Sequence, residues 1–335
     1  MVSTVRGTVA VFLLVGFFGF QTVCDSEDMA TTEAPVVAKD RQLERFDYDS
    51  VVQVEQLIKD LNYTPEAWQA GIREVPRLYI TNIPLHWREK TSKELDVQTK
   101  KRVFFQFLGP LVLHSNELIQ ADRDRIKLII TALRSGAAVS SEDQAFLREI
   151  ATTYNVIEGE ADLTDRTLQD TLLRRVDTLP PSLVLAQAAE ESGWGTSRFA
   201  AEGNSLFGMW TWRGKGVVPL QQRSELGNYK IASYETPLQS VVAYMNNLNT
   251  HQAYGELRAR RAELRKAGLK VSGRELANTL TCYSERGQAY VNSLQSLIKM
   301  NKLQLADDAY LGDGPTILLI AVSYTHLRAH ETKAN

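Results

Sequence analysis

The chain has 335 residues, of which 44% are hydrophobic and 23% are charged, and its formal net charge at pH 7 is −2. This length is enough to bury one full core and a smaller second unit. A nucleic-acid-binding protein usually carries a strongly basic surface, so this charge balance argues against nucleic acid as a partner. The two cysteines, Cys24 and Cys282, do not make a disulfide framework, and Cys282 is expected to be a buried structural thiol.

The first 24 residues have the pattern of an export segment. Arg6 is their one basic residue, and the apolar run from Thr8 to Phe20 is shorter than a comfortable transmembrane span. Residues 1–24 are therefore expected to be a cleaved signal peptide or a retained anchor in the inner membrane. Residues 25–45 begin with an acidic stretch without periodicity, which predicts a flexible tether. The rest of the chain should then lie in the periplasm or elsewhere in the cell envelope.

Helical spacing of apolar residues dominates residues 46–158, which we expect to form a helical accessory region. The run from Val97 to Ile119 contains Pro110, which should kink or divide that helix because proline removes a backbone hydrogen bond.

The most informative stretch runs from Leu179 to Trp212. Two prolines suit the first turn of a helix, the residues from Ser182 to Ala189 are apolar or small on nearly every side, and Gly193 should end the helix. This pattern predicts a helix buried all round. Glu190 and Glu191 lie in its last turn, where the helix dipole and desolvation both disfavour negative charge.

Two interpretations of these glutamates are open. A carboxyl against an apolar wall has a raised pKa and can serve as a general acid, and Glu191 is the candidate because it shares a helix face with Gln187. In the other interpretation, both glutamates are solvated residues at a fraying helix end.

Glycines, Pro219 and short Val, Tyr and Ile runs between Arg213 and Pro237 predict a small β-hairpin lobe. Helices should follow it, opened by Thr236 and by Ser272, each with a capping-box residue three positions later.

The segment AQAAEESGWGTSRFAAEGNSLFGMW resembles the signature of bacterial glucosaminidase-type peptidoglycan hydrolases, a group similar to glycoside hydrolase family 73 within the lysozyme-like superfamily. The resemblance covers roughly Leu179 to Leu303 and includes YSERGQAYVNSL, which looks closest to the proteobacterial Bax-type branch. One departure is Glu190, where many members have leucine. The resemblance implies a mainly α (α+β) fold, in which residues 162–305 form a lysozyme-like helical domain with a small β-hairpin lobe.

The family pattern implies that Glu191 is the general acid. Glu225, in the expected lobe, is the candidate second carboxylate, with Glu202 and Glu235 as competitors. Tyr283 resembles a tyrosine that faces the acid and orients an acetamido group, although a hydrogen-bonded core tyrosine would give the same pattern. Substrate contact is predicted for seven further residues: Gln187, Trp194, Asn204, Phe207, Trp210, Trp212 and Tyr290. For Trp194, packing against the acid is the alternative.

The resemblance implies an endo-β-N-acetylglucosaminidase that cleaves the GlcNAc-β-1,4-MurNAc bond of peptidoglycan strands without a metal or organic cofactor. Two alternatives stay open: a lytic transglycosylase or lysozyme that uses the same acid, and a glycan-binding scaffold with little activity.

Residues 306–335 are expected to be a tail outside the folded domain, so that ending the chain after Gly314 should leave folding unchanged. Within this tail, SYTHLRAHET resembles a peptide translated from sequencing-adapter DNA, which predicts that about 321–335 is a sequence artefact.

Overall fold

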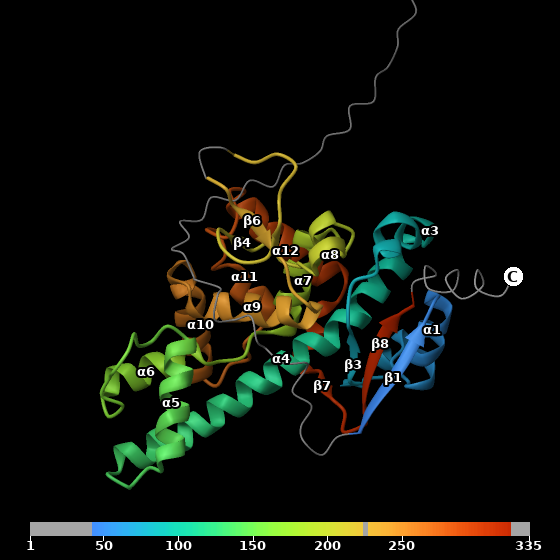
Figure 1. The fold of residues 1–335 in the computed structure, drawn as a ribbon. Helices are drawn as coiled ribbons and strands as arrows, with labels where there is room; N and C mark the ends of the chain where they lie inside the picture. The colour runs from blue at the N-terminus through green and yellow to red at the C-terminus, as the bar shows by residue number, and fades with distance from the viewer. Residues whose placement is uncertain (1–41, 224–226, 323–335) are drawn as a thin grey trace, which may run out of the picture.

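The computed structural model describes residues 42–223 and 227–322 (Figure 1). The predicted export segment, residues 25–41 of the predicted tether, Glu225 and residues 323–335 lie outside this range. The expectation of a mainly helical fold with small sheets is confirmed. None of the helices in the described ranges is both long and apolar enough to cross a bilayer.

The α-helices, the π-helical turn η2 and the 3-10 turns η4 and η5 make up most of the described chain: α1 (Val51–Asp60), α2 (Pro65–Gln69), η2 (Trp87–Thr91), α3 (Ser92–Glu94), α4 (Val97–Arg134), α5 (Ser141–Thr153), α6 (Arg166–Arg175), α7 (Pro181–Ser192), α8 (Arg198–Gly203), α9 (Pro237–Thr250), η4 (Gln252–Tyr254), α10 (Gly255–Lys266), α11 (Gly273–Ala277), α12 (Gln288–Met300) and η5 (Leu303–Asp308). The strands are short: β1 (Leu43–Tyr48), β2 (Glu74–Val75), β3 (Leu78–Ile80), β4 (Trp210–Thr211), β5 (Gly216–Val217), β6 (Lys230–Ala232), β7 (Tyr310–Leu311) and β8 (Thr316–Ala321).

The long helix α4 runs across the molecule (Figure 1). It begins at Asp96, whose carboxylate accepts hydrogen bonds from the backbone N–H groups of Gln98 and Thr99. The helix continues unbroken through Pro110, so the predicted division at this residue is wrong. Leu111 and Val112, which follow the proline, are completely buried, and this packing holds the helix together where a backbone hydrogen bond is missing.

Residues from both ends of the described chain share one parallel sheet with strand order β1-β8-β3. Leu43 of β1 lies opposite Thr316 of β8, and Leu78 of β3 lies opposite Ile317. A second parallel pair joins β2 to β7. The predicted boundaries are therefore wrong at three places: the tether ends before β1, residues 46–158 contain strands as well as helices, and residues 306–321 are part of the fold.

The physical reason for the last correction lies in β8 itself. As the central strand it has neighbours on both edges, and Ile317 and Leu319 are buried. Central strands of parallel sheets are near-continuous apolar runs, and TILLIA is such a run.

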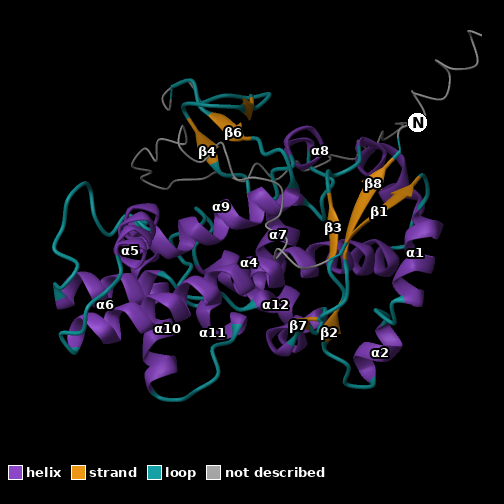
Figure 2. Cartoon of the chain, turned by 60° about the horizontal axis from the view of Figure 1, so that its bottom comes forward, coloured by secondary structure: helices purple, strands orange, loops and turns teal. Residues whose placement is uncertain are grey.

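The predicted lobe is a three-stranded antiparallel sheet with strand order β4-β6-β5. It stands at the top of the molecule in Figures 1 and 2, apart from the parallel sheet. The predicted β-hairpin lobe is thus confirmed, with one strand more than a simple hairpin.

Helix α7 lies at the centre and packs against α4, α11, α12 and η5. Of its residues, only Glu190 and Glu191 are not fully buried, as the pattern from Ser182 to Ala189 predicted. Gly273 begins α11 directly against the start of α7, where a Cβ atom would lie 2.5 Å from the backbone nitrogen of Leu183. One apolar core includes buried residues from α1 through β8, so no separate accessory region can be delimited.

We predict that Leu319→Ala will lower the free energy of unfolding by about 2–5 kcal/mol, because it leaves a cavity in the middle of the parallel sheet. Leu319 is 1% exposed, whereas Leu85 is 55% exposed. Leu85→Ala, the same chemical change on the surface, should stay within about 0.5 kcal/mol of the parent. Denaturant unfolding of the three proteins checks this, and equal stability would show that β8 contributes nothing to the fold.

Candidate active site

The C-terminal end of α7 is shaped by a reversal of the backbone. Gly193 adopts the left-handed conformation, with φ 56° and ψ 46°, and closes the helix as predicted. Trp194 also has a positive φ, 64°. The chain therefore turns sharply just after Glu190 and Glu191, which stand at the helix end.

A chain of hydrogen bonds leads from the core to Glu191. Tyr290 donates its hydroxyl proton to Oε1 of Glu191 at 2.8 Å. Gln187 donates through Nε2 to the Tyr290 oxygen at 3.0 Å and accepts, at Oε1, a hydrogen bond from the hydroxyl of Tyr244. Gln187, Tyr244 and Tyr290 are at most 1% exposed, so the orientation of the Glu191 carboxyl is set by a buried, fully partnered network.

This environment raises the pKa of Glu191 from 4.5 to about 7. The largest cause is desolvation by burial, which disfavours the charged carboxylate. The hydrogen bond from Tyr290 lowers the pKa, the negative charge of Glu190 raises it, and the positive charge of Arg286 lowers it. Glu191 can therefore hold a proton near neutral pH and give it to a ligand atom.

The neighbouring carboxylate has different partners. Oε1 of Glu190 accepts a hydrogen bond from the Arg286 guanidinium at 2.6 Å and another from the Ser293 hydroxyl at 3.0 Å. Glu190 thus forms an ion pair, and Glu191 is left as the uncompensated carboxyl.

Three tyrosines surround the acid. The rings of Tyr283 and Tyr290 are parallel within 6°, with centroids 5.3 Å apart, and Tyr254 lies 5.9 Å from Tyr283. Desolvation and the nearby Glu191 charge hold the pKa of Tyr283 and Tyr290 well above 10. These phenols are therefore neutral hydrogen-bond donors, and Tyr283 stacks on the tyrosine that is bonded to Glu191. A role of Tyr283 in catalysis stays a prediction.

Phe207 and Asn204 make contacts within the protein that stabilise the site. Phe207 is 1% exposed and stacks on Tyr244, with centroids 3.8 Å apart. Asn204 donates to the backbone oxygens of Tyr234 and Glu235 and accepts from the backbone N–H of Ile83.

The structure therefore corrects the predicted substrate contacts of four residues: Gln187, Asn204, Phe207 and Tyr290. Three of these side chains are buried and the amide of the fourth is engaged by backbone groups, so their contacts position the site.

Trp194 points to α4 instead of forming a wall of the acid's pocket. Its ring meets Phe104 and Phe105 edge-on, at 5.8 and 5.3 Å between centroids, and the Lys101 ammonium lies 5.0 Å from its ring centre. Its backbone oxygen accepts a hydrogen bond from Trp87. Direct substrate contact by Trp194 stays a prediction.

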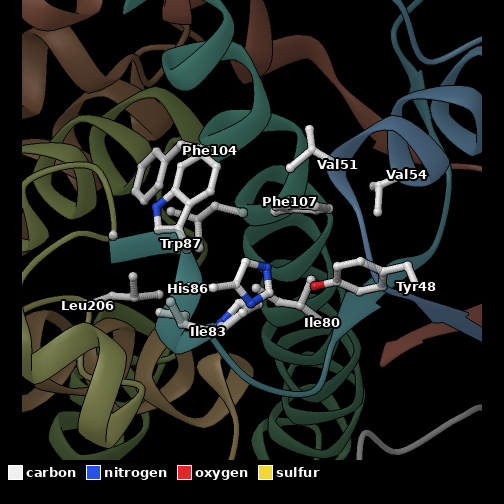
Figure 3. A pocket seen from close by; sticks show the side chains of 13 residues that line it. Tyr48, Val51, Val54, Ile80, Ile83, His86, Trp87, Phe104, Phe107 and Leu206 are labelled. Carbon is white, nitrogen blue, oxygen red and sulfur yellow. The ribbon is translucent and has the colours of Figure 1, made fainter. Parts of the chain in front are cut away.

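Behind this turn lies an apolar pocket between α1, α4 and the parallel sheet (Figure 3). Tyr48, Phe107 and Trp87 line it, and it extends to Gly195, where a Cβ would lie 3.3 Å from the indole nitrogen of Trp87. The pocket supplies no carboxyl group, and its packing fixes the backbone that follows the acid.

The lobe contributes an aromatic wall. Trp210 stacks on Tyr229 at 4.6 Å between centroids and meets Trp212 edge-on at 6.0 Å. A cavity of about 50 Å³ lies between the lobe and the tyrosines beside Glu191, and its lining includes Trp210, Tyr254 and Tyr283. Cys282 also lines this cavity and is exposed, so the predicted buried thiol is wrong.

Three site residues were not predicted from the sequence: Tyr244, Tyr254 and Arg286. Arg286 lies inside YSERGQAY, so its position in the family-like segment was an available signal. Tyr244 and Tyr254 also lie within the family-like range, but nothing in their local pattern distinguishes either from an ordinary aromatic residue of a helical stretch. Among the described residues, no group of three or more His, Cys, Asp and Glu side chains is placed to hold a metal ion.

Comparison with known proteins gives three findings. Residues 170–303 match the glucosaminidase family, described as mannosyl-glycoprotein endo-beta-N-acetylglucosaminidase. The chain is 34% identical over 207 residues to Protein bax of Escherichia coli (strain K12), which covers 62% of this chain and 72% of that protein. The catalytic domain of the autolysin Auto from Listeria monocytogenes is 21% identical, with a TM-score of 0.31 over 51% of this chain and 90% of that one.

The family match spans the helix that carries Glu191 and the tyrosine that hydrogen-bonds to it, and the relationship to Protein bax extends over most of that protein's length. This chain belongs to the glucosaminidase family.

Proposed function

We propose that this protein is a glycoside hydrolase that cleaves the GlcNAc-β-1,4-MurNAc bond of peptidoglycan, with Glu191 as the general acid. The observation that carries the proposal is the carboxyl of Glu191, buried at a helix end, hydrogen-bonded to Tyr290 and with its pKa raised to about 7. Glycosidic bond cleavage requires such a protonated carboxyl at the leaving oxygen. The family membership supports a glycosidase.

The same reaction needs a second group that supports the positive charge developing on the sugar ring. We propose two sources: Glu225, or the substrate's own acetamido group oriented by Tyr283. Arg223 forms an ion pair with Glu285 at 3.2 Å, and Arg286 next to it binds Glu190. Arg223, a lobe residue two positions before Glu225, is thus linked to the turn that contains Glu285 and Arg286. Of the competitors, Glu202 is engaged in an ion pair with Arg198.

The wider setting is also proposed. Trp210 and Trp212 are only partly buried, and their rings suit the apolar faces of sugar rings; the substrate would be peptidoglycan glycan strands. The pattern of residues 1–24 supports a location in the periplasm or cell envelope, with anchoring in the inner membrane if that segment is retained.

Replacing Glu191 with glutamine tests the assignment. Glu191→Gln keeps the shape and can still accept from Tyr290 but has no transferable proton, so cleavage of purified murein should fall by about 10²–10⁴-fold. Glu190→Gln is the matched control and should keep most of the activity, since that residue forms an ion pair with Arg286.

The products separate the proposal from its rivals. A new reducing-end GlcNAc supports a glucosaminidase, a reducing-end MurNAc indicates a lysozyme, and 1,6-anhydro-MurNAc indicates a lytic transglycosylase. Absence of any product from the parent would indicate a glycan-binding scaffold. Loss of activity in Glu190→Gln alone would mean that Glu190, and not Glu191, is the general acid.

A second prediction concerns the dependence of stability on pH. The pKa of Glu191 is about 7 in the folded protein and 4.5 unperturbed, so the folded state keeps its proton after the unfolded state has lost it. The free energy of unfolding contributed by this group therefore falls as pH rises from about 4.5 to about 7. Glu191→Gln should match the parent below pH 4.5 and become more stable above it, by at most about 3 kcal/mol above pH 7.

Melting curves of both proteins from pH 4 to pH 8 check this. A difference in stability that is the same at every pH would contradict a raised pKa.

A third prediction concerns Tyr290. Its hydrogen bond lowers the pKa of Glu191, so Tyr290→Phe should raise that pKa and move the alkaline limb of the pH–activity profile to higher pH. Tyr154→Phe makes the same change at a buried tyrosine at the end of α5, outside the site, and should leave the profile in place. A shift to lower pH in Tyr290→Phe would mean that the hydroxyl holds the proton on Glu191.

A further inference from the structure

A large cavity lies beside the beginning of α7. Its volume is about 680 Å³, within the range usual for sites of small ligands. Its walls come from α2, the first half of α4, the beginning of α7 and the segment that joins α12 to η5. We call it the basic groove, after the four cationic residues that line it: Arg73, Lys101, Arg102 and Lys302.

The charges of the basic groove are unbalanced. Among the described residues that line it there is no Asp or Glu. Arg102 forms an ion pair with Glu55 at 2.5 Å, just outside the lining. Arg73 donates to the backbone oxygens of Trp68 and Ile72, which carry no net charge. The groove therefore keeps a positive potential that would attract carboxylates or phosphates.

The rest of the lining suits a peptide. The guanidinium of Arg73 lies 4.7 Å from the ring centre of Trp68, so a cation–π contact holds this cation in the wall of the groove. Side-chain amides of Gln69, Gln98 and Asn301 also line the groove and can pair with peptide N–H and C=O groups. Apolar surface, amides and cations in one groove fit a short acidic peptide better than a bare phosphate.

The groove is joined to the proposed active site. Lys101 lines the groove, and its ammonium lies over the ring of Trp194, three residues after Glu191. Leu185 also lines the groove, and six residues of helix separate it from Glu191, a rise of about 9 Å.

We propose that the basic groove binds the carboxylate-bearing peptide stems attached to the glycan strand. The proposal rests on the proposed function for the source of the peptide, since peptidoglycan carries short acidic peptides on alternate sugars. Binding a stem in the groove would select peptide-bearing strands and fix their position relative to Glu191. The long N-terminal half of α4 would then serve recognition as well as packing.

Direct binding tests the proposal without catalysis. Peptide stems released from murein by an amidase, free of sugar, are titrated into the full-length protein in a calorimeter. Lys101→Gln with Lys302→Gln removes two lining charges and should weaken binding by about 5- to 10-fold, since each exposed charge pair contributes up to about 1 kcal/mol. Lys127→Gln with Lys266→Gln removes the same charge outside the lining and should leave the affinity unchanged.

Four further measurements sharpen the result. The same peptides with amidated carboxyls should bind more weakly than the native stems, and raised salt should reduce the difference between parent and Lys101→Gln/Lys302→Gln. Inorganic phosphate should compete poorly. Murein stripped of its stems should be cut by the parent and by Lys101→Gln/Lys302→Gln at the same rate, whereas intact murein should show a higher KM with the variant.

Failure of this proposal is distinguishable from failure of the proposed function. No binding of free stems, equal weakening in both double variants, or competition by phosphate as strong as by peptide would each overturn the groove assignment while leaving glycan cleavage intact. Glu191→Gln should bind free stems as the parent does. If the stems bind but no glycan is cleaved, the proposed function is wrong and the assignment of the groove stands.

Discussion

The structure depends on keeping one carboxyl, that of Glu191, out of water without giving it a cation. Burial of α7 on all sides provides the apolar surroundings, and the Tyr244–Gln187–Tyr290 chain of hydrogen bonds fixes the carboxyl's orientation. Both tyrosines in that chain are themselves held by packing: Phe207 stacks on Tyr244 and Tyr283 on Tyr290. A raised pKa is the direct consequence of this arrangement.

A helix that is apolar all round needs partners on all sides, and this need explains the course of the rest of the chain. Helices α4, α11 and α12 surround α7, and the parallel sheet in turn supports α4. The turn after Glu191 is held from the same direction, because Trp87 donates to the backbone oxygen of Trp194 and closes over Gly195. Residues before 97 and after 305 therefore contribute to the rigidity of the site, Trp87 by a direct hydrogen bond to the turn and the sheet by supporting α4.

Local patterns were enough to predict α7, the position of Glu191 and the β lobe, because their signals lie within a few residues: paired prolines, an apolar run, a terminating glycine and short strands between turns. The parallel sheet could not be predicted in this way. Its strands β1 and β8 are about 270 residues apart in the chain, and nothing in LERFDY or TILLIA names the other as its partner. The sequence left open whether Pro110 would kink or divide this helix, because a local rule for proline takes no account of buried neighbours; the structure excludes the division.

The same limit explains why the roles of Gln187 and Phe207 were misassigned. A family pattern shows which residues occur near an acid, but only packing shows whether a side chain faces a ligand or another side chain. Glu190 gives the clearest contrast with its neighbour: two adjacent glutamates end the same helix, one is neutralised by Arg286, and the other is left to keep its proton. Because the charge of Glu190 raises the pKa of Glu191 while Arg286 lowers it, this ion pair places two opposing charges beside the acid. The pKa of Glu191 is then decided mainly by burial, a property of the whole fold that no short motif contains.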